Sequence, residues 1–153
     1  MGNIVFNIAK GRIKAYAELP LTNDALLVVL LKAAGLEADG TIADHDTLSA
    51  LLAAANDEAD FTGYGARKAL ASIAFDLDDT NNWLDIDAAD PTAWTNSGAS
   101  QAIGACLICY DDDTTGGTDA NIVPLVKLDC VVTFDTGVPV TLNFNAEGFA
   151  RAA

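Results

Sequence analysis

The sequence predicts a mainly β fold, arranged as a β-sandwich or barrel-like single domain with one or two short helices in its N-terminal half. Two long apolar runs, Ala102–Tyr110 and Ile122–Val132, flank an acidic segment with Gly and Thr, which is typical of a β-hairpin with a long loop. Shorter alternating runs follow one another closely, with turn residues between them. A chain of 153 residues, 51% of them hydrophobic, can form one core, so residues 1–153 are expected to be one domain.

The N-terminal segment, residues 1–20, is expected to be extended or helical. Its apolar positions Ala9, Ile13, Tyr16 and Ala17 recur at helical spacing. Pro20 ends any helix that forms, because the residue before a proline avoids the helical conformation.

One strand and one helix are predicted in the next part of the chain. The nearly continuous apolar run Ala25–Ala33 favours a strand that is buried on both faces. Asp44–Ala55 predicts a helix that Asp44 or Asp46 caps. Its apolar stripe consists of Leu48, Leu51 and Leu52.

The remaining strands are predicted from period-two alternation and from the turns that separate them. Residues 76–82 are expected to form an acidic turn, and Phe149 with Arg151 is expected to extend the last strand. The predicted strands are Arg67–Phe75, Trp83–Asp87, Thr92–Thr95 and Val138–Asn145.

The formal net charge of −14 excludes one class of partner. Proteins bind DNA by neutralising phosphates with Lys and Arg, so we expect no nucleic-acid partner. The longest apolar run, Ala25–Leu31, is too short to span a bilayer, so we expect no membrane partner. Cys106, Cys109 and Cys130 do not make a disulfide framework and are interpreted as small core residues in a reducing compartment.

Acidic clusters are the candidate metal sites. Asp76, Asp78 and Asp87 occupy positions one, three and twelve of a calcium-loop spacing, but position six is Asn81 where Gly is required, and position twelve is Asp where Glu is usual. The sequence therefore favours solvated loop tips, and we expect no cofactor. The candidate metal ligands are Asp76, Asp78, Asp87, Asp111 and Asp113.

No catalytic constellation is recognisable in the sequence. His45 is the single histidine, and we interpret it as a surface residue at a helix start. The glycines at positions 63, 65, 116 and 117 lack the spacing and the lysine of a phosphate-binding loop. We expect that the chain is not an enzyme.

Three of the eight basic residues lie in the N-terminal segment, and on an acidic chain they could dock an acidic partner surface. The alternative is a basic helix face with no partner. Three apolar residues of the same segment lie outside any clear core pattern. The candidate partner contacts are Val5, Phe6, Ile8, Lys10, Arg12 and Lys14.

Several stretches carry a family resemblance that covers nearly the whole chain. The internal stretches are Ala43–Leu51, Ala59–Leu70, Ala89–Trp94 and Ala105–Leu125, and the terminal ones are Gly2–Arg12 and Ala146–Ala152. In this order they resemble a family of small structural proteins of tailed bacteriophages, and the terminal stretches look like those of phages of actinobacteria.

The resemblance implies a virion protein that is assembled in the host cytoplasm. Its implied role is a head decoration or minor capsid protein that binds and stabilises the lattice of the major capsid protein. Self-association is also implied, with a trimer on a local three-fold axis as the expected form. The alternative is a structural protein or adhesin of the neck or tail that binds host glycan or Ca²⁺ through its acidic loops.

Overall fold

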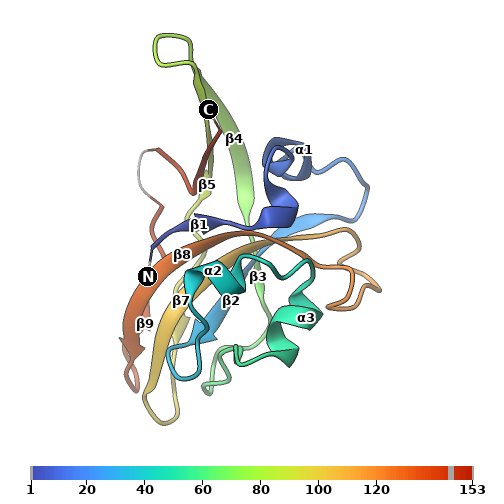
Figure 1. The fold of residues 1–153 in the computed structure, drawn as a ribbon. Helices are drawn as coiled ribbons and strands as arrows, with labels where there is room; N and C mark the ends of the chain where they lie inside the picture. The colour runs from blue at the N-terminus through green and yellow to red at the C-terminus, as the bar shows by residue number, and fades with distance from the viewer. Residues whose placement is uncertain (1, 145–146, 153) are drawn as a thin grey trace.

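The computed structural model describes residues 2–144 and 147–152, and its largest sheet has the strand order β1-β8-β7-β2-β3. All neighbours in this sheet are antiparallel. The two long strands β7 and β8 curve across the whole body of the molecule (Figure 1). The five strands are β1 (Ile4–Val5), β2 (Ala25–Lys32), β3 (Lys68–Ala69), β7 (Gln101–Asp111) and β8 (Val123–Phe134).

The core is centred on β2 and β7. Residues Leu26–Leu31 of β2 and Ile103–Asp111 of β7 are all buried, as expected for continuous apolar runs covered on both faces. β2 is the predicted two-sided strand, and β7 with β8 is the predicted hairpin, so both predictions are confirmed. The cysteines are free: Cys106 and Cys109 are buried, and Cys130 packs against the core.

The helices are short and belong to the N-terminal half. The helical spacing of the N-terminal segment is confirmed, because Ala9, Ile13 and Ala17 are all buried. One more helix forms than the sequence suggested, since α2 was not predicted. The elements are the 3-10 turn η1 (Asn7–Ala9), α1 (Ile13–Ala17), α2 (Asp39–Ile42) and α3 (Leu48–Ala53).

The prediction for α3 was too long at both ends, and its predicted caps were wrong. Thr47 is the N-cap, and its Oγ1 accepts from Ala50 N at 3.1 Å. The amides of Leu48 and Ser49 donate to carbonyls of the β7–β8 loop, at 2.8 and 2.9 Å. These tertiary bonds fix the first turn at Leu48, so Asp44 and Asp46 lie outside the helix.

A second antiparallel sheet has the order β10-β5-β4, with β4 (Ala71–Asp78), β5 (Trp83–Ala89) and β10 (Ala150–Ala152). The β4–β5 hairpin extends well beyond the rest of the molecule (Figure 1), and we call it the arm. The predicted turn at residues 76–82 was too long, because Asp76 and Asp78 still pair with β5. Phe149 and Arg151 were predicted to extend the strand Val138–Asn145. Arg151 instead belongs to β10, and Phe149 directly precedes it.

The smallest sheet pairs β6 (Trp94–Thr95) with β9 (Pro139–Val140). The predicted strand Val138–Asn145 was therefore too long, because β6 offers only two residues for pairing; position 145 lies outside the described residues. Trp94 of β6 and Val140 of β9 lie near Leu30 of β2 and Phe134 of β8, because all four line one cavity. This apolar cavity of about 140 Å³, which we call the socket, is lined by Leu30, Trp94, Cys130, Val132, Phe134, Val140, Thr141, Leu142 and Asn143. The mainly β class is thus confirmed.

Candidate functional site

The N-terminal segment is fastened along the edge of the main sheet. β1 pairs with β8 at Ile4–Lys127 and Val5–Val126, and the amide of Phe6 donates to the Leu125 carbonyl at 3.0 Å. This register turns Phe6 inward, where it is fully buried. Phe6 therefore cannot contact a partner, which corrects the expectation from the sequence.

The other candidate contacts of the segment keep some exposure. Val5 and Ile8 are half-buried and pack against the core. Lys10, Arg12 and Lys14 are exposed, so their role as partner contacts stays a prediction. Lys14 forms an ion pair with Glu18 one helical turn later, and its Nζ lies 5.3 Å from the centre of the Phe75 ring on the arm.

A buried lysine, which the sequence analysis did not single out, anchors this segment. Lys127 has no exposed surface, and its Nζ lies 3.0 Å from Asp39 Oδ1 and 2.6 Å from Asp129 Oδ1. It also donates to the carbonyl of Gly2 at 2.9 Å, while the amide of Gly2 donates to Asp39 Oδ2 at 2.7 Å. The Gly2 amide, followed by Lys127, lowers the pKa of Asp39. A lysine inside the apolar run Leu125–Leu128 was the available signal.

The arm does not bring its three candidate metal ligands together. Asp76 faces Asp85 and Asp78 faces Trp83, whereas Asp87 faces Ala74. Asp78 and Asp87 are therefore four residue steps apart along the hairpin, roughly 13 Å. Asp78 Oδ1 instead accepts from the amides of Thr80 and Asn81, both at 2.9 Å, and closes the tip of the arm. The calcium-loop hypothesis for this segment is wrong because the chain continues as strands.

Asp111 and Asp113 hold the β7–β8 loop in shape. Asp111 Oδ1 accepts from the amide of Asp113 at 3.1 Å, and Asp113 Oδ1 accepts from the amide and hydroxyl of Thr115 at 3.0 and 2.5 Å. The hydroxyl and amide of Thr115 lower the pKa of Asp113. Within residues 2–144 and 147–152, no group of three or more His, Cys, Asp or Glu side chains is arranged to hold a metal ion.

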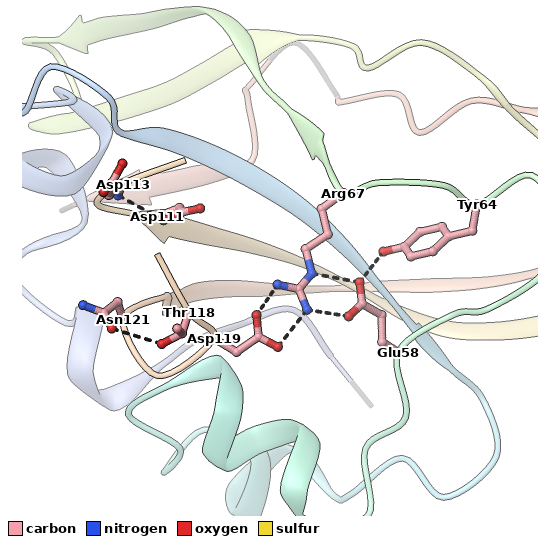
Figure 2. Close-up of polar contacts among 8 residues, drawn as sticks. All are labelled: Glu58, Tyr64, Arg67, Asp111, Asp113, Thr118, Asp119 and Asn121. Atoms are coloured by element: carbon pink, nitrogen blue, oxygen red, sulfur yellow. Dashed lines mark hydrogen bonds and ion pairs between the residues drawn. The ribbon is translucent and has the colours of Figure 1, made fainter. Parts of the chain in front are cut away.

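Arg67 is the centre of the densest polar network, which Figure 2 shows. Its Nε and Nη2 donate to the two carboxylate oxygens of Glu58 at 2.9 and 2.6 Å, and its Nη1 and Nη2 donate to those of Asp119 at 2.5 and 3.0 Å. Tyr64 donates to Glu58 Oε1 at 2.9 Å, while its own oxygen accepts from the Leu30 amide at 3.2 Å.

This network joins three parts of the chain that are remote in sequence. The fork geometry of a guanidinium suits two carboxylates, and the pairing raises the pKa of Arg67, with Glu58 as the largest cause, and lowers that of Asp119. Burial raises the pKa of Tyr64. The sequence placed Arg67 only at a strand start; nothing in local periodicity pointed to Asp119, which is 52 positions away.

An open cleft lies beside the Arg67 network. Its volume is about 600 Å³, and Arg67 and Asp119 are among the residues that line it. Asp111 at the end of β7 and the loop residues Thr114 and Thr118 add a carboxylate and hydroxyls to the lining. His45 takes no part in it. Its Nε2 lies 2.7 Å from Glu37 Oε2 and its side chain is mostly buried, so the expectation of a surface histidine at a helix start was wrong.

The arm has two unlike faces. Phe75 and Leu77 lie opposite Ile86 and Leu84 in the β4–β5 register, and they are 38% and 64% exposed. On the other face Arg151 Nε donates to Asp85 Oδ1 at 2.6 Å. Alternation in the sequence predicted the strands Arg67–Phe75 and Trp83–Asp87. It did not predict that Phe75 and Leu77 keep exposed surface while Ile86 on the same face is fully buried.

Comparison with known proteins finds no match to a protein-family model, to a curated protein or to a solved structure. Among the described residues, no helix has the length and apolar character needed to cross a membrane.

Proposed function

We propose that the chain is a virion structural protein, a capsid decoration or minor capsid protein that binds and stabilises the lattice of the major capsid protein. The observation that carries the proposal is the exposed basic segment around Lys10 and Arg12 on a chain of net charge −14. Lys127 fastens the start of this segment to the sheet edge. The family resemblance of nearly the whole chain supports the same role.

The physical reason is electrostatic orientation. Basic residues that stand alone on an acidic surface bring one face of the molecule towards an acidic partner and turn the other faces away. A protein that coats a lattice needs such a defined contact face. The proposal places the protein in the virion and does not assign it an enzymatic activity.

Copy number in purified particles tests this proposal. Quantitative mass spectrometry against the major capsid protein is expected to give many copies per particle, on the scale of the lattice itself. A handful of copies per particle would indicate a position in the neck or tail instead. Its absence from particles would refute the virion assignment.

The cleft beside Arg67 favours a second candidate function, an adhesin of the neck or tail. Its carboxylates and threonine hydroxyls can hydrogen-bond to sugar hydroxyls, and its volume of about 600 Å³ is within the range of small-ligand sites. Thermal unfolding with added Ca²⁺ or oligosaccharide separates the two candidates. A ligand-dependent rise in melting temperature supports the adhesin, because a ligand stabilises the state that binds it.

A further inference from the structure

The lining of the socket includes a buried hydrogen-bond donor that has no acceptor. Trp94 is 2% exposed, and its Nε1 is the only buried side-chain nitrogen without a hydrogen bond among residues 2–144 and 147–152. A buried indole N–H normally has a partner, because burial removes the water that would otherwise accept its hydrogen bond. The unpaired donor therefore points to an acceptor that the chain itself does not supply.

The neighbours of Trp94 fix the position of its ring. Lys68 Nζ lies 4.2 Å from the ring centre, over one face of the indole. The same ammonium group donates to Thr92 Oγ1 and to the Ala93 carbonyl, both at 2.9 Å. Lys68 is not part of the socket lining, whereas Val140, which pairs with Trp94 across β6 and β9, is. The socket thus adjoins the part of the indole that Lys68 leaves uncovered.

The remaining lining of the socket selects against charged ligands. Seven of the nine lining residues are apolar, and none of the nine is acidic or basic. Burial raises the pKa of Cys130, which keeps this thiol neutral. The two polar residues, Thr141 and Asn143, are exposed. A charged ligand would lose its hydration here without gaining an ionic partner, so the socket suits a neutral one.

The size of the socket suits a small organic molecule better than water. Its volume is about 140 Å³, and an apolar cavity of roughly 150 Å³ holds benzene. A buried water molecule typically has about three polar partners. Trp94 Nε1 is the one buried polar side-chain atom without a partner among the described lining residues. The lining therefore matches a ligand with an apolar body and a single acceptor.

We propose that the socket binds a neutral, benzene-sized molecule that is apolar except for one carbonyl or ether oxygen, and that this oxygen accepts a hydrogen bond from Trp94 Nε1. Because the lining comes from β2, β6, β8, β9 and the residues after β9, the ligand joins the smallest sheet to the largest one. The socket shares no lining residue with the cleft beside Arg67. Binding here is independent of the proposed capsid contact.

Two probes of equal shape test the site on the full wild-type chain. Cyclopentanone has as many heavy atoms as benzene and one carbonyl oxygen, and methylenecyclopentane has a methylene group in place of that oxygen. Heteronuclear NMR of the isotope-labelled chain shows two indole N–H signals, because the chain has two tryptophans. Cyclopentanone should move the Trp94 signal downfield, as expected for a new hydrogen bond, and methylenecyclopentane should not. The inference is overturned if cyclopentanone, below concentrations that unfold the chain, leaves the Trp94 signal in place.

A pair of matched variants separates the donor from the cavity. Trp94→Phe removes the donor and keeps an aromatic ring, so it should weaken binding of cyclopentanone about threefold to tenfold relative to methylenecyclopentane. Trp83→Phe is the control, because Trp83 lies on the arm, where its ring is 4.0 Å from the Arg151 guanidinium carbon. It should leave the ratio of the two affinities unchanged, and it identifies the remaining indole signal as that of Trp94. Equal ratios in the two variants would overturn the inference. If Trp94→Phe does not fold, the comparison of the two probes on the wild-type chain decides.

Discussion

Lys127 links the chemistry of one residue to the position of the N-terminal segment. A fully buried ammonium group is costly unless it is paired and hydrogen-bonded, and here it has two carboxylates and a backbone carbonyl. Breaking a buried pair is far more destabilising than breaking an exposed one. The arrangement therefore holds Gly2 and β1 in place, and with them the direction in which Lys10 and Arg12 face.

The pairing of Arg67 with Asp119 should make the free energy of unfolding depend on pH in the acid range. Arg67 lowers the pKa of Asp119 in the folded chain. The stabilisation of the fold by this pair is therefore fully present above the pKa of Asp119 in the unfolded chain, about 3.9. It is lost as the pH falls through the lower pKa that Asp119 has in the folded chain. Asp119→Asn should cost about 1 kcal/mol at pH 7, since the pair is partly exposed. The difference from wild type should shrink towards pH 2.

Urea unfolding at a series of pH values measures this difference in free energy. Asp57→Asn serves as the control, because Asp57 is an exposed carboxylate outside the Arg67 network. A difference between wild type and Asp119→Asn that stays constant from pH 7 to pH 2 would contradict the assignment.

At the residue scale, the sequence predicted the exposure of charged side chains, but it did not predict burial or pairing that depends on distant strands and loops. The exposure of Lys10, Arg12 and Lys14 followed from their charge. The burial of Phe6 depended on the register of β1 against β8, which is a non-local property. The Arg67 network was missed for the same reason, since its carboxylates come from positions 58 and 119.

Among the elements, the long ones were predictable and the short ones were not. β2, β7 and β8 have apolar runs rich in β-branched residues, with turn residues around them, and this combination favoured strands. β6 and β9 have two residues each, and the limits of α3 depend on Thr47 and on bonds to a distant loop. Such contacts leave no periodic signal in the sequence.

The attachment of the arm to β10 depends on one glycine. Gly148 has φ +75°, and a Cβ at this position would lie 2.2 Å from the Ile86 carbonyl oxygen. Gly148→Ala should therefore push β10 away from β5, with a loss of several kcal/mol or of the β10 pairing. Gly137→Ala is the control, because Gly137 has φ +78° with open space around it. It should cost only the conformational penalty of about 1–2 kcal/mol.

Amide hydrogen exchange of β5 and β10, together with urea unfolding, measures this prediction. In Gly148→Ala the amides that pair β10 with β5 should lose protection, while those of β2 and β7 keep it. Equal effects of the two alanine variants would mean that backbone conformation alone, and not the approach to Ile86, sets the requirement for glycine.

At the scale of the whole molecule, charge is unevenly distributed. The eight basic residues include Arg67, Lys127 and Arg151, which are paired with carboxylates of the same chain. Lys10 and Arg12 are exposed on the segment that Lys127 anchors. On a chain of net charge −14, these two exposed basic residues give the proposed capsid contact a direction.

Charge reversal in this region is the most direct test of that contact. Arg12→Glu should weaken binding to particles that lack the protein, and adding Lys10→Glu should weaken it further, because each reversal replaces an attraction to an acidic lattice by a repulsion. The control is Lys32→Glu, which changes the net charge equally but affects a lysine that is paired with Asp60 in a different part of the molecule. Co-sedimentation with particles at low and high salt measures the effect. Binding should fall with salt for wild type, since exposed charges are screened, and should depend less on salt in the double variant. Equal binding of Arg12→Glu and wild type at low salt would exclude the basic segment as the docking face.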